Sequence, residues 1–125
     1  MATARDAYAQ YNRNKIMTAT PAELTLMLYE GAIKFCNIAI AAIEQKDILK
    51  ANTNIQKVQR IIEEFQLTLN FDYEIANDFN NVYNYLITRL REANISKDID
   101  VLKEVNEHLR TMRDTWKEVM RTANR

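Results

Sequence analysis

The chain has 125 residues, 47% of them hydrophobic and 27% charged, with 17 basic and 17 acidic side chains. This length suits one domain with a single core, and the zero net charge argues against nucleic-acid binding, which usually requires a basic surplus or patch. Cys36 is the single cysteine, so an internal disulfide is excluded and a reducing compartment such as the cytoplasm is favoured. One glycine and one proline favour an all-α fold with short connections.

Residues 1–19 are polar and rich in alanine, and their bulky apolar side chains are Tyr8, Tyr11, Ile16 and Met17. A helix over residues 2–11 would be marginal without docking. The segment has no long apolar run, so we expect neither a secretion signal nor a membrane anchor. We also see no uninterrupted apolar stretch of the roughly 20 residues that a membrane-spanning helix requires. We predict an N-terminal arm over residues 1–19 and a folded domain over residues 20–125.

Residues 21–45 are predicted to form the first long helix. Thr20 can cap its first turn, Pro21 lacks an amide that would go unpaired, and Glu23 can reach back to Thr20 in a capping box. At about 100° per residue, one apolar stripe follows this helix, and we assign it to the core. Its members are Leu24, Met27, Leu28, Gly31, Phe35, Ile38 and Ala42. For Gly31, we expect close approach of a neighbouring helix.

The same helix carries a second apolar stripe, roughly 150° around from the first. It comprises Leu26, Tyr29, Ile33, Cys36, Ile40 and Ile43. A helix in a small bundle needs only one apolar stripe, so two interpretations stay open: the face is buried by another helix or by the arm, or it binds a partner. A removable arm would satisfy both. If exposed, the stripe would drive association, and its spacing suits a partner helix or an extended amphipathic peptide.

Three further amphipathic helices are predicted, over residues 48–69, 73–93 and about 98–122, with Asp47 and Asp72 as caps of the first two. Their apolar stripes are Ala51, Ile55, Val58, Ile62, Phe65 and Leu69; Ile75, Phe79, Val82, Leu86, Leu90 and Ala93, widened by Ala76, Tyr83 and Ile87; and Leu102, Val105, Leu109, Met112, Trp116 and Val119. Four such helices with short loops predict an antiparallel four-helix bundle.

Catalytic, metal-binding and cofactor-binding patterns are weak, and we predict no such site. Glu104 and His108 stand four residues apart, but the chain has one histidine and offers too few ligands for zinc or di-iron. Cys36 lies among apolar residues, which raise the pKa of a thiol. An enzyme of the chorismate-mutase kind would need several inward basic residues, which the first long helix lacks. A bundle that self-assembles through its second stripe is a further alternative.

Several of these segments resemble the bacterial flagellar secretion chaperone family FliS. The similar segments are AY at residues 7–8, TATPAELTLMLYEGAIKF at residues 18–35, VYNYLITRLREAN at residues 82–94, KDIDVLKEV at residues 97–105, and Trp116. They cover nearly the whole chain in the family's order. One departure is that Asp72 and Tyr73 stand where FliS-like sequences often carry a glycine.

The resemblance implies a cytoplasmic chaperone, not an enzyme, that binds the C-terminal segment of newly made flagellin. Such a chaperone prevents premature polymerisation and assists delivery to the flagellar type III export apparatus. It implies the export gate and other flagellar proteins as further partners, and neither a cofactor nor membrane insertion. Tyr8 matches the family's N-terminal tyrosine, and we assign it a binding or capping role. Together with the second stripe, the predicted partner-binding residues are Tyr8, Tyr11, Ile16, Leu26, Tyr29, Ile33, Ile40, Tyr83 and Ile87.

Overall fold

The computed structural model describes residues 4–123, except for the side chains of residues 4, 5, 8 and 11. Within this range the chain forms five helices and no strand, which confirms the all-α prediction. The helices are α1 (Ala4–Thr18), α2 (Pro21–Glu44), α3 (Ile48–Thr68), α4 (Ile75–Ser96) and α5 (Ile99–Ala123).

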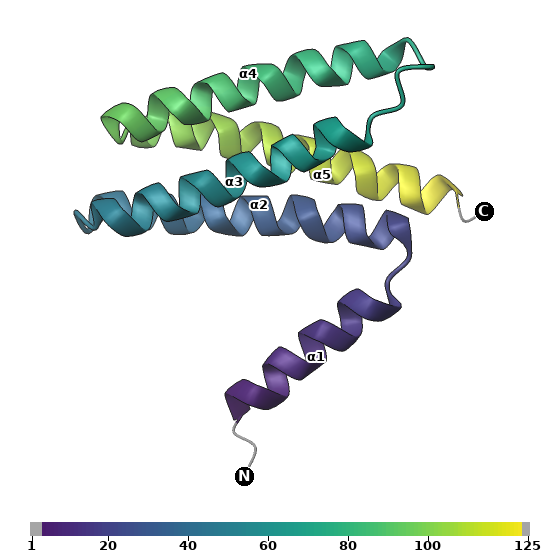
Figure 1. Ribbon diagram of the computed structural model, residues 1–125, viewed down its shortest axis with the longest axis horizontal. Helices are drawn as coiled ribbons and strands as arrows, with labels where there is room; N and C mark the ends of the chain where they lie inside the picture. The colour runs from purple at the N-terminus through teal and green to yellow at the C-terminus, as the bar shows by residue number, and fades with distance from the viewer. Residues whose placement is uncertain (1–3, 124–125) are drawn as a thin grey trace.

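Helices α2 to α5 form a closed ring of neighbours. α2 packs against α3 and α5, and α4 packs against the same two helices. Figure 1 shows that consecutive helices of this group run in opposite directions, while α1 projects away from the start of α2. The predicted arm is therefore more helical than expected, yet it stands apart from the four packed helices.

The caps show why the helices begin where they do. Thr20 has an extended backbone, and its hydroxyl accepts from the Glu23 amide at 3.1 Å. The second half of the predicted capping box is different, because the Thr20 hydroxyl itself donates to Glu23 Oε1 at 3.2 Å. Asp47 caps α3 by accepting from the Lys50 amide at 3.1 Å, as predicted. The predicted Asp72 cap is wrong: Glu74 occupies the N-cap of α4 and makes no side-chain cap bond.

The core is formed by one face of each packed helix. Its centre contains an aromatic layer in which the Phe65 ring lies 4.5 Å from the Tyr29 ring and 5.7 Å from the Tyr83 ring, between centroids. The Tyr29 and Tyr83 hydroxyls are 3.5 Å apart, so these two buried phenols satisfy one another. The core cluster is Tyr29, Ala32, Ile33, Cys36, Ala39, Ile55, Val58, Ile62, Phe65, Tyr83, Leu86, Ile87, Leu90, Ala93, Leu102, Val105 and Leu109.

This core draws on both α2 stripes and decides between the two interpretations left open for the second one, which is largely buried by other helices. The stripe predicted to be left over contributes Tyr29, Ile33 and Cys36 to the core, with exposed fractions of 7%, 7% and 0%. The physical reason lies in the small side chains of Ala32 and Ala39, which belong to neither stripe.

 Ala32 and Ala39 are both fully buried, and such small residues let neighbouring helices approach this side of α2 closely.

A smaller correction concerns α4. Tyr83 and Ile87, which we predicted to contact a partner, are 5% and 6% exposed and lie in the core. Three residues of the predicted core stripe are instead exposed: Ile75, Phe79 and Val82 at 59%, 45% and 39%. Because Tyr83 stacks on Phe65 of α3, the buried face of α4 is rotated toward the residues expected only to widen it.

Candidate functional site

An apolar groove of about 530 Å³ crosses from the end of α1 over α2 to α3. Its lining residues are Ile16, Leu24, Met27, Leu28, Gly31, Phe35, Ile61 and Glu64. Five of these belong to the α2 stripe that the sequence assigned to the core. The groove exists because these five residues are not fully buried by the bundle, although Leu28 and Phe35 pack against the core cluster.

Gly31 lies where α2 faces Ile61 of α3. A Cβ atom built on Gly31 would lie 3.8 Å from Ile61 Cδ1, which is an ordinary van der Waals distance. The expected close approach of a neighbouring helix is therefore not what requires glycine at this position. The missing side chain instead leaves space in the groove between Met27 and Phe35.

Polar contacts fix both ends of the groove wall. At the start of α2, the Trp116 indole Nε1 of α5 donates to the Ala22 carbonyl at 2.9 Å. Further along, the Lys57 ammonium lies 5.0 Å from the centroid of the Phe35 ring, within the range of a cation–π contact. Glu64 adds a carboxylate to the lining. The groove is thus an apolar channel with charged groups beside it, a composition that suits an amphipathic polypeptide.

The structure separates the seven predicted partner-binding residues whose side chains it describes into three groups. Ile16 lines the groove and is 49% exposed, whereas Leu26 and Ile40 are half-buried outside it. Four are buried in the core: Tyr29, Ile33, Tyr83 and Ile87. The side chains of Tyr8 and Tyr11 lie outside the described part of the chain.

Sequence reasoning missed the groove residues of α2 and also Ile61 of α3. A usable signal was present, because this stripe contains Met27 and Phe35, which are larger and more adaptable than the alanines beside the other stripe. Large side chains suit a binding surface, and small ones suit close helix packing. The two stripes are otherwise equally apolar, so periodicity alone does not distinguish them.

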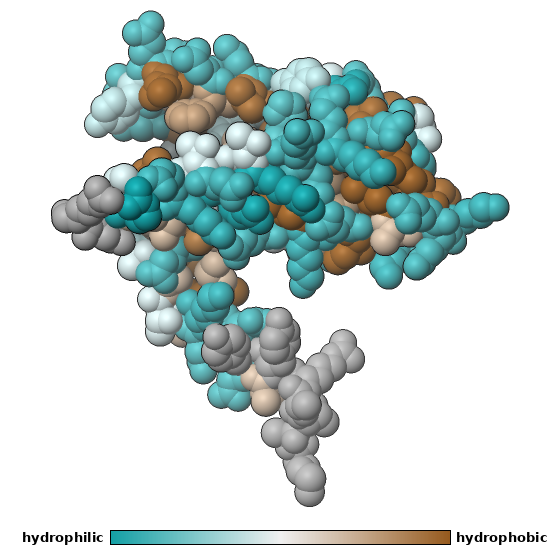
Figure 2. All heavy atoms as spheres, turned by 180° about the vertical axis from the view of Figure 1, so that it is seen from behind, coloured by the Kyte–Doolittle hydropathy of each residue, from teal (hydrophilic) through white to brown (hydrophobic). Residues whose placement is uncertain are grey.

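Other apolar side chains are exposed at helix ends. Figure 2 shows hydrophobic residues gathered toward the end of the molecule that carries the α2–α3 and α4–α5 connections. Exposed apolar side chains at these connections include Ile48, Leu49 and Ile95, at 51%, 78% and 88%. They do not line the apolar groove, so we place the candidate site at α1, α2 and α3.

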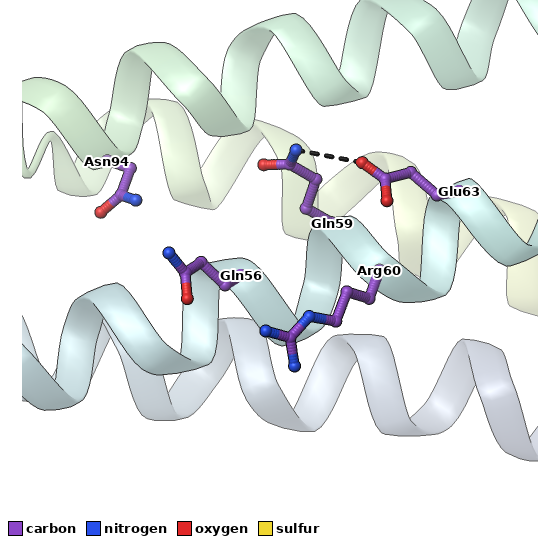
Figure 3. Close-up of a pocket in the computed structure, with 5 residues that line it drawn as sticks. All are labelled: Gln56, Gln59, Arg60, Glu63 and Asn94. Carbon is purple, nitrogen blue, oxygen red and sulfur yellow. Dashed lines mark hydrogen bonds between the residues drawn. The ribbon is translucent and has the colours of Figure 1, made fainter.

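A polar pocket of about 300 Å³ lies between α3 and α4 (Figure 3). It is lined by Gln56, Gln59, Arg60, Glu63 and Asn94. Gln59 Nε2 donates to Glu63 Oε1 at 3.1 Å, which occupies part of its hydrogen-bonding capacity. The lining contains no histidine, cysteine or hydroxyl side chain, so it offers none of the usual catalytic nucleophiles besides a carboxylate.

Two of the three residues considered as chemical candidates, Glu104 and Cys36, have structural contacts. Glu104 accepts from the Tyr85 hydroxyl at 2.5 Å and pairs with Arg89 at 3.1 Å. The Tyr85 hydrogen bond, followed by Arg89, lowers the pKa of Glu104. Cys36 Sγ donates to the Leu102 carbonyl at 3.3 Å, and burial raises the pKa of this thiol to about 12. Within residues 4–123 we find no group of three potential metal ligands.

Helix α2 is long and apolar enough, by length and composition alone, to cross a membrane. The sequence-based expectation concerned an uninterrupted apolar run, whereas Glu30 and Lys34 interrupt the apolar residues of α2. The same composition follows from its two apolar stripes, one of which lies in the core and the other in the groove.

The comparisons with known proteins agree with one another. The family model described as "Flagellar protein FliS" matches residues 4–123. The flagellar secretion chaperone FliS of Bacillus subtilis is 40% identical over 121 residues, which cover 97% of this chain and 91% of that protein. The FliS of Salmonella typhimurium is 31% identical over 123 residues, covering 94% and 90%.

The fold has a counterpart among solved structures. The crystal structure of a flagellar chaperone from bacteria superposes with a TM-score of 0.76 and covers 96% of this chain and 99% of the other. Its sequence identity is 19%, so this likeness concerns the arrangement of the helices.

Proposed function

Because the chain belongs to the FliS family of flagellar secretion chaperones, we propose that it binds the C-terminal segment of flagellin in the cytoplasm. The family is one of chaperones and not of enzymes. In our proposal, binding prevents premature polymerisation of flagellin and assists its delivery to the flagellar type III export apparatus. Proteins of the export gate are proposed as further partners.

The observation that carries this proposal is the uncovered apolar stripe of α2. Leu24, Met27 and Phe35 of this stripe line the apolar groove, and Phe35 also packs against the edge of the core cluster. An amphipathic client segment placed there would remove apolar surface from water on both partners. A client that is disordered before export must order on binding, so its affinity depends on such an extended apolar contact.

We propose two functional units within the chain. Helices α2 to α5, within residues 20–125, would be an antiparallel four-helix bundle that presents the groove. Residues 1–19 would be an arm that acts as a removable lid over it. Ile16 supports the lid because it lines the groove directly. We further propose that Tyr8 and Tyr11 take part in capping or client binding.

The proposed client surface differs from the one that the sequence favoured. Tyr29, Ile33, Tyr83 and Ile87 are buried in the core, so a client would reach them only if the bundle opened. We therefore place the client on the other stripe of α2, together with Ile61 of α3. Leu26 and Ile40, which are half-buried, remain proposed contacts at the edges of α2.

The test is a calorimetric titration with the C-terminal segment of flagellin from the same organism. We expect Met27→Glu to weaken binding by at least roughly tenfold, because it places a charge in the apolar groove. Leu67→Glu is a matched control, since Leu67 is 81% exposed and does not line the groove. Circular dichroism should show unchanged helix content for both variants. Equal affinities of wild type and Met27→Glu would exclude the groove as the binding site.

A further inference from the structure

A second groove lies between α2 and α5 and has a volume of about 540 Å³. It is lined by Asn37, Ile40, Lys103, Asn106, Glu107 and Arg110. None of these residues lines the apolar groove, and most of them are polar. The chemistry of this groove therefore differs from that of the proposed client site.

An amide pair joins the two walls of this groove. Asn106 Nδ2 on α5 donates to Asn37 Oδ1 on α2 at 2.7 Å. Asn106 is 6% exposed, and its Oδ1 is buried without a hydrogen-bond partner. A buried acceptor without a donor is unfavourable, because it has lost water and gained nothing in exchange. Unlike Asn106, Asn37 is exposed.

The unused hydrogen-bonding groups of this pair match one peptide unit. Asn106 Oδ1 is an acceptor, and the Asn37 carboxamide retains N–H donors beyond the bond described. A peptide unit offers one N–H and one C=O. Only an extended segment has these groups available, because a helix uses them internally. The terminal torsion of an asparagine is soft, so the buried Asn106 carboxamide can turn toward an arriving donor, exchanging its bond to Asn37 Oδ1 for one to the peptide.

The charges around the pair favour an acidic ligand. Lys103 and Arg110 outnumber Glu107, and the described residues include no ion pair that involves any of the three. A carboxylate next to the bound peptide unit would gain a charge-assisted contact with Lys103 or Arg110.

We propose that Asn37 and Asn106 bind the main chain of an extended, acidic stretch of the client polypeptide. The peptide N–H would donate to Asn106 Oδ1, and the peptide C=O would accept from Asn37 Nδ2. This inference rests on the proposed function, because the client supplies the segment. It adds a second contact on the α2–α5 side of the chaperone, where main-chain recognition complements apolar binding in the first groove.

The test measures stability and client affinity separately, with the flagellin C-terminal segment as the probe. Asn106→Leu removes the unpaired acceptor, so we expect an equal or higher thermal midpoint together with roughly three- to tenfold weaker binding. Asn37→Ala changes an exposed residue, so it should fold normally and weaken binding by a similar factor. Wild-type affinity in both variants would overturn the inference while leaving the proposed function intact.

Asn54→Leu is the matched control. Asn54 is also 6% exposed, but its Nδ2 donates within its own helix to the Lys50 carbonyl at 2.8 Å. We expect this variant to bind the segment with wild-type affinity. If Asn54→Leu weakened binding as much as Asn106→Leu, the loss of affinity would be a general effect of replacing a buried asparagine, and the proposed contact would be wrong.

Peptide chemistry locates the contact. The flagellin segment is methylated at one backbone nitrogen at a time, and each methylated peptide is titrated against wild type and against Asn106→Leu. We expect one peptide to bind wild type more weakly than the unmodified segment does. For that peptide, Asn106→Leu should cause no further loss of affinity. Additive losses at every position would overturn the inference. Failure of the unmodified segment to bind wild type would overturn the proposed function and this inference with it.

Discussion

The indole of Trp116 donates to the backbone carbonyl of Ala22, at 2.9 Å from Nε1 to oxygen. This bond joins α5 to the first turn of α2, next to the Thr20 cap. It fixes the end of α2 at which the apolar groove begins. Trp116 therefore links α5 to the part of α2 from which the groove wall extends.

We expect Trp116→Phe to lower the free energy of unfolding by about 1 kcal/mol, because it removes this hydrogen bond and keeps most of the ring. Urea denaturation followed by circular dichroism measures the change. Client affinity should also fall, since the start of α2 becomes less fixed. An unchanged free energy of unfolding would show that water donates to the Ala22 carbonyl as well as the indole does, so that the Trp116 hydrogen bond adds no net stability.

Ile33→Arg should prevent folding or lower the free energy of unfolding by at least about 3 kcal/mol, because it buries an unpaired charge. Ile33 is 7% exposed and belongs to the core cluster. Leu67→Arg, at an 81% exposed position of α3, is the control and should fold normally. A folded Ile33→Arg protein with near wild-type stability would show that the second stripe of α2 lies at the surface and is open to a partner.

Gly31 provides a test that separates folding from binding. Gly31→Ala should raise the free energy of unfolding by up to about 1 kcal/mol, because alanine favours a helix and its Cβ fits beside Ile61. Gly31→Leu should fold but block the groove, so client affinity should fall well below that of Gly31→Ala. Thermal denaturation and calorimetry measure the two effects. Full affinity of Gly31→Leu would contradict the groove assignment.

The buried thiol of Cys36 makes the free energy of unfolding depend on pH in the alkaline range. Its pKa is raised to about 12 in the folded protein by burial, whereas an unfolded thiol titrates near about 8.5. The unfolded state therefore loses its proton first, and stability falls as the pH rises from about 8.5 toward 12. Cys36→Ala should show a shallower fall over pH 8.5–10 in urea denaturation. Identical slopes in the two proteins would show that Cys36 does not control this dependence.

Much of the fold follows from local sequence signals, and the site follows less well. The Thr20 and Asp47 caps are read directly from residue type and spacing, because each cap depends on a few neighbouring residues. Which stripe of α2 faces the core depends instead on how closely α3 and α5 approach. That contact is decided by Ala32 and Ala39, whose small size gives no signal in a hydrophobic pattern.

The Asp72 and α4 predictions failed for a related reason. Both assumed that a helix begins and faces inward as its own pattern indicates, whereas Tyr83 is held by stacking on Phe65 of another helix. The Asn37–Asn106 contact could not be predicted from sequence patterns either, because the two residues are polar and 69 positions apart. Contacts between distant residues are set by the packing of whole helices.

The ring of helix contacts has a consequence for biosynthesis. α2, the first helix of the bundle, packs against α5, the last one. Part of the buried face of α2 is therefore covered only after α5 has been made. During translation, Cys36, whose thiol donates to the Leu102 carbonyl of α5, stays uncovered on that side until residues 99–123 have left the ribosome. A nascent chain halted after α4 would expose apolar surface on both faces of α2. This chain, a member of a chaperone family, is thus itself exposed to aggregation until its final helix is made.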